Sequence, residues 1–447
     1  MTPDRDKTAL FETMPIRQAV WRQILPAVAS QMIALIYNLA DTYFVGMMGD
    51  PGQTAAVTVV SSSFLMLTAI SNLFGIGGAS LIARALGARD RDKARQVSAL
   101  ALWGGLAGAC LFSLLFLLLS DPILRLCGAT EGTVRIAGSY AMWAVVIGGP
   151  AAIVNTLLAN LVRAEGSAAR AAAGVSLGGV VNILLDPFFV LPQFLGLGAV
   201  GAGMATALSN ALAALYFLLL CAKRGTSVLT LRPSALRGAG KYLRELLAVG
   251  FPASVQYALT VVAVAAQSRF VSHYATEAVA GLGIVKKLDQ LPLYFSIGVS
   301  NGLLPLLAYN YASGNQARRR ATFRFGVGIS LGFSLLCLVC YEAFAPFLTG
   351  LFIDNALTTQ YSAAFLRIMV TAMPMMAVCY PMIVQFQAMG RVRESLICSV
   401  LRKGVLDIPL LFILDALLPL YGCMMVQPIV DAVSLAVAAA FYRKVNR

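Results

Sequence analysis

Residues 23–48 read QILPAVASQMIALIYNLADTYFVGMM. This run is longer than the roughly 20 apolar residues that a helix needs to cross a bilayer, and Asp41 is its only charged side chain. Lipid offers no partner for unpaired backbone groups, and the run lacks the two-residue alternation of an outer-membrane strand. We therefore expect a transmembrane α-helix that carries one acidic side chain deep in the bilayer.

Runs of the same kind fill most of the chain. Of its 447 residues, 59% are hydrophobic and 12% are charged, whereas ordinary soluble domains carry roughly 25% charged residues. This composition excludes a soluble globule and predicts an all-α integral membrane protein with about twelve transmembrane helices. The expected spans are 23–48, 55–81, 97–119, 136–162, 171–191, 200–221, 243–271, 278–306, 323–347, 361–388, 396–414 and 418–442.

The basic residues indicate how the chain is threaded through the membrane. The formal net charge is +14, which in a soluble protein would suggest a nucleic-acid partner. Here the Lys and Arg residues gather in every second loop, for example at 84–95, 223–241 and 318–320. By the positive-inside rule these loops and both termini are cytoplasmic. We therefore expect a multi-pass protein of the bacterial cytoplasmic (inner) membrane that contacts membrane lipid and does not bind nucleic acid.

The sequence patterns do not favour catalysis or a resident metal. His273 is the only histidine, and the cysteines fall mostly within apolar segments, which argues against a His/Cys metal site and against disulfides. The G-x-S-x-G matches at 174–178 and 328–332 lie in expected helices, whereas a nucleophile elbow needs a strand-to-helix turn. We therefore expect a protein that is not an enzyme and has no cofactor.

The two halves of the chain resemble each other. The matching positions are Pro26 with Pro252 and Phe44-Val45 with Phe270-Val271, at one constant offset. Internal repeats are typical of secondary transporters, in which two bundles enclose a binding site. We expect two pseudo-symmetric six-helix bundles: an N-terminal lobe of residues 1–222, a cytoplasmic linker of residues 223–242 and a C-terminal lobe of residues 243–447.

Two acids lie where a membrane helix would ordinarily be apolar. Asp41 lies deep in the first expected span and Asp186 deep in the fifth, with Asn182 one turn earlier on the same face. A charged carboxylate at the bilayer centre costs about 3 kcal/mol on insertion scales, so intramembrane acids usually mark ion or substrate pathways. With Thr206 of the sixth span, these residues could form an oxygen-rich pocket inside the N-terminal lobe.

Such a pocket suits two kinds of cation. Neighbouring carboxylates in an apolar surround can bind and release a proton near neutral pH without a histidine. Carboxylate and amide oxygens are also hard ligands that suit Na⁺, with Asp41, Asn182 and Asp186 as its candidate ligands. The sequence leaves H⁺ and Na⁺ open. It also leaves open the interpretation that the acids only fix helix packing.

Further residues are candidates for a substrate cavity between the lobes. Tyr37 and Asn38 share a helical face with the first-span acid, and Gln267 occupies the equivalent position in the second half. Met373 belongs to a methionine-rich segment, and such flexible side chains suit an adaptable binding wall as well as ordinary packing. Pro26 would bend the first helix, and bends are where packed helices can move during alternating access.

The second half also carries charged residues within or near its spans, namely Arg269, Lys286, Lys287, Asp289 and Asp407. Lys286 and Asp289 are three residues apart, so they could neutralise each other on one helical face. Internal pairing, or snorkelling of long side chains to the membrane surface, is one interpretation of this set. A role in substrate binding or gating is the other.

Several of these residues stand in phrases that occur together in a known family. The phrases are Pro26 followed by NLADTYFVG at 38–46, RAEGS at 163–167, NILLDP at 182–187 and GAVGAGMAT at 198–206. They resemble the multidrug and toxic compound extrusion (MATE) family, closest to its DinF-like branch in the MOP flippase superfamily, over nearly the full chain. The most specific part is the combination of Asp41 with Asn182-x-x-x-Asp186.

The resemblance implies the MATE fold and a cation-coupled antiporter that exports organic, often cationic compounds such as drugs, dyes and toxins by alternating access. In similar proteins, the residues that correspond to Asp41, Asn182, Asp186 and Thr206 form the cation site, and the proline that corresponds to Pro26 bends as that site changes state. We expect H⁺ or Na⁺ as the coupling ion and a protein that works as a monomer. A lipid or lipid-linked oligosaccharide flippase of the same superfamily is the alternative, because the second half carries several basic residues.

Overall fold

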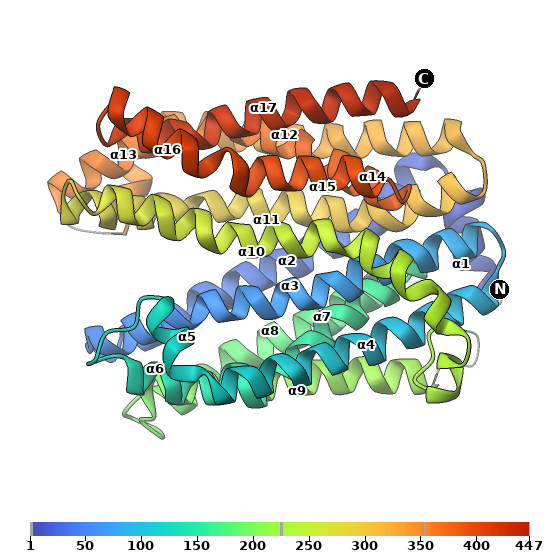
Figure 1. Ribbon diagram of the computed structural model, residues 1–447, viewed down its shortest axis with the longest axis horizontal. Helices are drawn as coiled ribbons and strands as arrows, with labels where there is room; N and C mark the ends of the chain where they lie inside the picture. The colour runs from blue at the N-terminus through green and yellow to red at the C-terminus, as the bar shows by residue number, and fades with distance from the viewer. Residues whose placement is uncertain (1–2, 224–226, 353–354, 447) are drawn as a thin grey trace.

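The computed structural model describes residues 3–223, 227–352 and 355–446. In this part of the chain every regular element is a helix. The helices form two bundles that lie side by side, and both ends of the described chain lie at the same end of the molecule, here called the terminal end (Figure 1). The N-terminal lobe holds α2 (Ile16–Gly46), α3 (Pro51–Gly87), α4 (Arg91–Leu118), α5 (Ser120–Leu126), α6 (Val134–Ala141), η1 (Met142–Ile147), α7 (Gly149–Ala164), α8 (Ala168–Val190) and α9 (Gly198–Lys223), preceded by α1 (Pro3–Glu12). The C-terminal lobe holds α10 (Leu243–Val271), α11 (Thr276–Ala312), α12 (Gln316–Gly350), α13 (Ala356–Val370), α14 (Met373–Ala388), α15 (Val392–Val400), η4 (Leu401–Val405), α16 (Asp407–Leu417) and α17 (Tyr421–Asn446).

Each expected span corresponds to one helix or to one broken helix. Within the described residues, nine helices are long and apolar enough to cross a membrane, and two bent pairs raise the number to as many as eleven. The pieces of the remaining span, α15, η4 and α16, are each shorter than a single crossing needs. The expectation of an all-α integral membrane protein is therefore confirmed, with three of its spans divided between separate helices.

Prolines and a glycine explain these interruptions. The two bent pairs are α6/η1 with α7 and α13 with α14, each bent by 47°, and a proline stands in the first turn of both α7 and α14. A proline fits a first turn but cannot continue the hydrogen bonding of a preceding helix. In the third broken span, Gly404 has φ of 150°, a conformation that side chains disfavour. Pro26, in contrast, lies inside the continuous helix α2.

Glycines allow the two lobes to approach closely in the half of the molecule nearest the terminal end. A Cβ atom added to Gly298 of α11 would lie 2.7 Å from Cα of Val28 on α2, and one added to Gly302 would lie 2.8 Å from Cα of Ile24. Real Cβ atoms essentially never approach other heavy atoms this closely. The backbones of α2 and α11 are therefore in direct contact beside Pro26.

Polar contacts reinforce the same end of the lobe interface. Glu245 of α10 forms ion pairs with Arg84 of α3 at 3.1 Å and with Lys93 of α4 at 3.3 Å. The Ser80 hydroxyl of α3 donates a hydrogen bond to the carbonyl of Gln387 on α14 at 2.7 Å. These contacts join elements of both lobes, so the lobes are fastened together near the terminal end.

The linker between the lobes is anchored by a buried acid. The predicted linker spans residues 223–242, of which 224–226 lie outside the described residues. Glu165, which follows α7, accepts hydrogen bonds from the Ser227 hydroxyl at 2.6 Å and from the backbone N–H groups of Val228 and Leu229 at 2.6 and 3.2 Å. The short helices η2 (Pro233–Leu236) and η3 (Ala239–Tyr242) follow. The Glu165 carboxylate thus fixes the described part of the linker to the N-terminal lobe.

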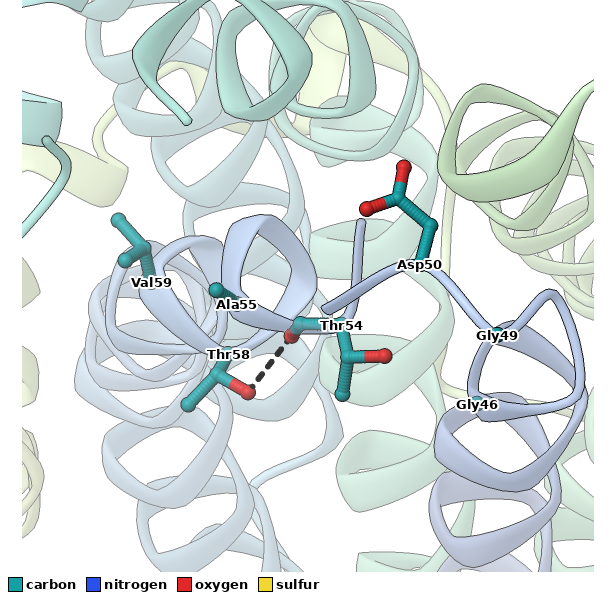
Figure 2. Close-up of a pocket in the computed structure, with 7 residues that line it drawn as sticks. All are labelled: Gly46, Gly49, Asp50, Thr54, Ala55, Thr58 and Val59. Carbon is teal, nitrogen blue, oxygen red and sulfur yellow. Dashed lines mark hydrogen bonds between the residues drawn. The ribbon is translucent and has the colours of Figure 1, made fainter. Parts of the chain in front are cut away.

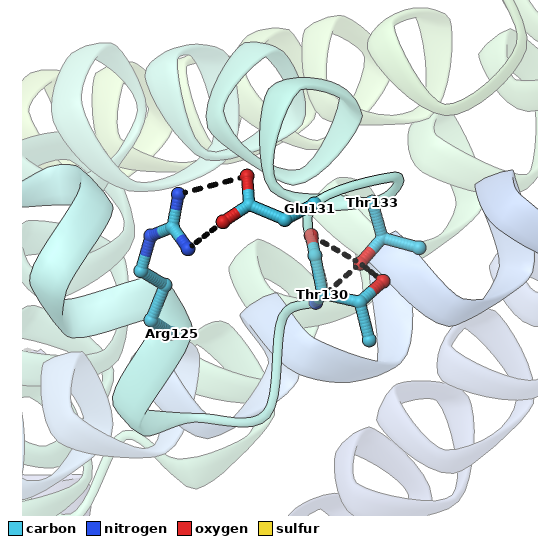
Figure 3. Close-up of polar contacts among 4 residues, drawn as sticks. All are labelled: Arg125, Thr130, Glu131 and Thr133. Carbon is cyan, nitrogen blue, oxygen red and sulfur yellow. Dashed lines mark hydrogen bonds and ion pairs between the residues drawn. The ribbon is translucent and has the colours of Figure 1, made fainter.

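At the opposite end of the molecule, an exposed ion pair closes the loop between α5 and α6 (Figure 3). The Arg125 guanidinium donates two hydrogen bonds to the Glu131 carboxylate, at 2.5 and 3.2 Å. These hydrogen bonds hold the pKa of Glu131 below its ordinary value. The Thr130 N–H also donates to the Thr133 hydroxyl at 3.0 Å, which completes a tight turn. This pair accounts for Arg125, a basic residue outside the loops that carry most of the positive charge.

Candidate functional site

The polar residues of α8 and α9 come together inside the N-terminal lobe. Asp186 is fully buried, Asn182 is 2% exposed and Thr206 is 8% exposed, so none of these side chains faces lipid. The Asn182 amide donates a hydrogen bond to Oδ1 of Asp186 at 3.3 Å, as the four-residue spacing on one helical face allows. Asn182 and Asp186 are therefore in contact inside the N-terminal lobe.

Asp41 approaches this group from α2. The absence of a side chain at Gly179 lets α8 pack closely on α2, since a Cβ atom there would lie 2.7 Å from Cγ2 of Ile33. The carboxylates of Asp41 and Asp186 lie within range of each other's charge. The two acids, far apart in the sequence, thus share one chamber in the N-terminal lobe, called here the acid pair.

Several oxygen atoms of this chamber lack a hydrogen-bond donor. Oδ1 of Asp41, Oδ2 of Asp186 and Oδ1 of Asn182 are buried and have no hydrogen-bond partner among the described residues. A buried acceptor without a donor is costly. A proton would satisfy one carboxylate, and Na⁺ would satisfy several oxygens at once. The residues present therefore fit either cation, although within the described chain no group of three or more His, Cys, Asp or Glu side chains could hold a metal ion.

Tyr140 of α6 is a member of the chamber that sequence reasoning missed. Its side chain is 6% exposed, its hydroxyl lies near the Thr206 side chain, and it interacts electrostatically with both carboxylates of the acid pair and with Tyr37. Tyr140 lies in an apolar run with no unusual pattern around it. Only the packing of α6 against α9 brings it to the acids, so the sequence carried no signal for it.

A pair of amides extends the polar chamber toward the terminal end. The Asn155 side chain of α7 donates to the Asn210 side chain of α9 at 3.1 Å. The Asn210 amide in turn donates to the backbone carbonyl of Thr206 at 2.9 Å. Oδ1 of Asn155 is buried without a partner among the described residues. The chamber thus continues as a polar path within the lobe.

The four residues expected to line a substrate cavity do not come together. Tyr37 is half-buried beside the acid pair, and Asn38 is exposed and donates to the carbonyl of Ala34 on its own helix at 2.7 Å. Gln267 is buried in the C-terminal lobe and donates to the carbonyl of Cys423 at 2.9 Å. Met373 is 1% exposed within a hydrophobic core of that lobe. Met373 therefore differs from expectation because it is packed in a hydrophobic core, and Gln267 differs because it is buried against α17.

Half-buried tyrosines lie instead at the boundary between the lobes. Tyr37 of α2 interacts electrostatically with Tyr294 of α11, and Tyr257 of α10 interacts with Tyr294 and with Tyr380 of α14. The Tyr257 hydroxyl lies near the Asn72 side chain of α3. These four tyrosines, called here the tyrosine group, come from both lobes and retain some exposure.

The buried charges of the C-terminal lobe largely balance one another. Arg402 and Asp431 form a buried ion pair at 2.8 Å, and the Arg402 guanidinium lies over the Tyr380 ring at 4.1 Å from its centroid. Arg269 and Lys287 are exposed, as expected for side chains that reach toward a membrane surface. The ion pair explains how an arginine is accommodated within a membrane span.

A small pocket lies beside the break in the eleventh span. It has room for about one water molecule, near 10 Å³, and its polar lining is Gln267, Lys286, Lys403, Asp407 and Gln427. Asp289 accepts from the Gln427 amide at 3.4 Å, and Asp407 accepts from the Gly404 N–H at 2.8 Å. No ion pair within 4 Å between Lys286 and Asp289 is found within the described chain, although the two charges interact electrostatically.

A larger hollow of about 610 Å³ opens where α2 meets α3, at the end opposite the terminal end (Figure 2). Its lining includes Gly46, Thr54 and Thr58 and one carboxylate, Asp50. The Asp50 side chain already caps α3 by accepting from the Gly52 N–H at 2.8 Å. This hollow is shallow and open, and it contains neither member of the acid pair, so the N-terminal chamber remains the candidate site.

The fold has two helical lobes, and one of them contains an acid pair whose Asp186 is buried and whose Asp41 is half-buried; this arrangement is that of a membrane transporter. The sequence profile of the MatE family matches residues 26–188 and 252–413, once in each lobe, so the chain belongs to the MATE family of transporters. A relative named multidrug export protein MepA, from Staphylococcus aureus strain MRSA252, is 29% identical over 431 residues, which cover 96% of this chain and 94% of the relative. As members of this family are transporters, the chain is not an enzyme.

Solved structures confirm the fold. One is described as an outward-facing conformation of a multidrug resistance MATE family transporter of the MOP superfamily; it matches with a TM-score of 0.90 and 24% identity over 98% of this chain and 97% of the other. Another is a MOP superfamily transporter from Pyrococcus furiosus, described as having a binding pocket of reverse polarity; it matches with a TM-score of 0.92 and 23% identity over 98% of each chain. At this identity the likeness concerns the fold alone.

Proposed function

We propose that this protein is a multidrug efflux antiporter that exchanges H⁺ or Na⁺ for organic, often cationic compounds. The observation that carries the proposal is the acid pair, because its buried oxygen atoms without donors suit a monovalent cation. The name of the MepA relatives supports drug export as the transported class. The half-exposed tyrosine group supports aromatic cations as substrates, since such cations are attracted to aromatic faces.

Helix α2 connects the cation site to the lobe boundary. It carries Asp41 into the chamber and Tyr37 to the tyrosine group, and its backbone contacts α11 beside Pro26. A cation that neutralises the acid pair removes the repulsion between the two carboxylates and lets α2 settle closer to α8. In this mechanism α2 then changes its packing on α11 and its contribution to the substrate site. Exchange follows because the two states bind cation and drug with different affinities.

The orientation in the membrane follows from the charge pattern. We propose that the terminal end faces the cytoplasm of a bacterial cell, since basic residues gather in the loops of that end. We also propose that the protein lies in the inner membrane and works as a monomer. The polar contacts between the lobes also gather there. The structure thus corresponds to a state that is closed on the proposed cytoplasmic side.

A flippase for lipid-linked pyrophosphates is the weaker alternative. Recognition of such a headgroup requires positive charge that is free to contact it. In the C-terminal lobe, Arg402 is already paired with Asp431. The pocket beside the helix break holds one acid, Asp407, as well as two lysines, and it has room for about one water molecule. The acid pair of the N-terminal lobe would also repel phosphate. We therefore favour drug export.

The experiment that tests the proposal is efflux of a fluorescent cation, such as ethidium, from proteoliposomes with an imposed pH gradient, an imposed Na⁺ gradient or neither. We expect one gradient to drive transport by the wild type. Asp41→Asn and Asp186→Asn should each abolish the gradient-driven component. Asp50→Asn is the matched control, because Asp50 caps α3 outside the acid pair. Gradient-driven efflux at the wild-type rate in both acid-pair variants would overturn the assignment.

A further inference from the structure

The short helix α1 packs across the terminal end of the molecule. Leu10 and Phe11 are each 2% exposed, and the Phe11 ring stacks on the Tyr309 ring of α11 with a centroid separation of 4.5 Å. The Tyr309 hydroxyl donates a hydrogen bond to the Glu12 carboxylate at 2.7 Å. A helix at the beginning of a chain would fray without such contacts, so the C-terminal lobe holds α1 in place.

Arg318 of α12 secures the end of α1. Its Nε donates to the carbonyl of Phe11 at 2.7 Å, and its Nη2 donates to the carbonyls of Met14 and Leu10 at 2.6 and 3.2 Å. The last carbonyls of a helix have no partner within the helix, and the helix dipole favours a cation there. One guanidinium therefore supplies the cap that the sequence of α1 does not provide.

The other side of α1 belongs to the N-terminal lobe. Only the residues around Met14 separate α1 from α2. A Cβ atom at Gly166, in the turn between α7 and α8, would lie 3.0 Å from both Leu10 and Phe11. The Glu12 carboxylate lies 3.9 Å from the Arg89 guanidinium of the turn between α3 and α4. The helix is thus tied covalently to one lobe and clamped non-covalently to the other.

We propose that α1 is a strap that holds the terminal end closed, and that α1 must release α11 and α12 before the lobes can separate at that end. The contacts with the C-terminal lobe are the ones that must break, because the short connection to α2 keeps α1 with the N-terminal lobe. The strap sets the population of the closed state and does not contact the acid pair. This inference rests on the proposed transport cycle only for its physiological meaning.

The test measures the distance between the lobes at the terminal end. Spin labels are placed on Ala169→Cys of α8 and Ser313→Cys of the α11–α12 turn, both exposed positions, in a background without the eight native cysteines. Electron–electron double resonance then gives the closed and open populations. Arg318→Ala should raise the ratio of open to closed protein by at least about tenfold, because even one hydrogen bond from a charged group is worth about that factor. Arg324→Ala, an exposed neighbour on the same helix, should leave the ratio unchanged.

A milder variant keeps the test valid if Arg318→Ala does not fold. Tyr309→Phe retains the stacked ring and removes only the hydroxyl that binds Glu12, so it should shift the distances in the same direction by a smaller factor. Wild-type distance distributions in the folded strap variants would overturn the proposal. Because the readout is a distance, a failure of gradient-driven transport would not affect it, and the two proposals can fail separately.

Discussion

The contact between α2 and α11 leads to a quantitative prediction for Gly298→Ala. The new Cβ atom would lie 2.7 Å from Cα of Val28 and 3.1 Å from the Val28 backbone nitrogen. Non-bonded carbon atoms prefer about 3.5–4.0 Å, so the helices must separate by roughly 1 Å. Both of these atoms belong to the Val28 backbone, so a rotamer change of the Val28 side chain, whose Cγ2 would lie 3.0 Å away, cannot relieve the clash. Overpacking of this kind costs about 1–3 kcal/mol.

This cost falls on the closed state of the terminal end. Alanine also stabilises helices relative to glycine by about 1 kcal/mol, but residue 298 is helical in both states of a transport cycle, so this gain cancels in their equilibrium. A penalty of about 1–3 kcal/mol therefore raises the ratio of open to closed protein by roughly 5- to 150-fold. Gly283→Ala is the matched control on the same helix, because an added Cβ atom there has nothing within 4 Å.

The assay is hydrogen–deuterium exchange at the terminal halves of α2 and α11, together with thermal unfolding in detergent. We expect faster exchange in Gly298→Ala and unchanged exchange in Gly283→Ala, with both variants folded. Exchange at the wild-type rate in folded Gly298→Ala would refute the reasoning, because the backbones of α2 and α11 would then not be in direct contact when the terminal end is closed.

Three further predictions concern single polar contacts. Glu165→Gln should lower the free energy of unfolding by about 1–3 kcal/mol, since the hydrogen bonds that Glu165 accepts gain from its charge. It should also speed hydrogen–deuterium exchange of the linker amides that Glu165 binds, and unchanged exchange of these amides would contradict the prediction. The Arg125 contact depresses the pKa of Glu131, so its small stabilisation is present above about pH 4 and is lost as the pH falls through the depressed value. Thermal unfolding of Glu131→Gln should therefore converge with the wild type in acid, and a constant difference at all pH values would be inconsistent with the pair. Asp431→Ala should lower the free energy of unfolding by about 3–5 kcal/mol, because it leaves Arg402 buried without its partner. In thermal unfolding, Asp431→Leu combined with Arg402→Met should recover much of this loss. Wild-type stability of the Asp431→Ala variant would argue against the buried pair.

Much of the fold could be predicted because lipid restricts the choices. Long apolar runs in a membrane form helices, and the match of Pro26 with Pro252 predicted a repeat, which the two family matches starting at residues 26 and 252 support. The breaks were harder to predict. Pro26 lies in a continuous helix, whereas the eleventh span is interrupted at Gly404, because neighbouring contacts decide whether a bend is accommodated.

The candidate site was predicted in part. Asp186 and Asn182 are close in the sequence, and the cost of burying charge indicated that Asp41 would have polar neighbours. Tyr140 was not predicted, because it lies on a separate helix and within an ordinary apolar run. Composition made Met373 a candidate for a binding wall as well as for ordinary packing, but composition does not show which face of a helix is packed. Residues that share a helix were thus predictable, and contacts between helices were not.

The most direct test of the account is the affinity of the purified protein for a fluorescent cationic drug, measured as a function of pH and of Na⁺ concentration. Because linkage between two ligands is reciprocal, a cation that binds Asp41 and Asp186 must weaken drug binding if the two are exchanged. We predict that drug affinity of the wild type falls as the coupling cation rises, and that Asp41→Asn and Asp186→Asn abolish this dependence. The same dependence in the wild type and in both variants would contradict the account.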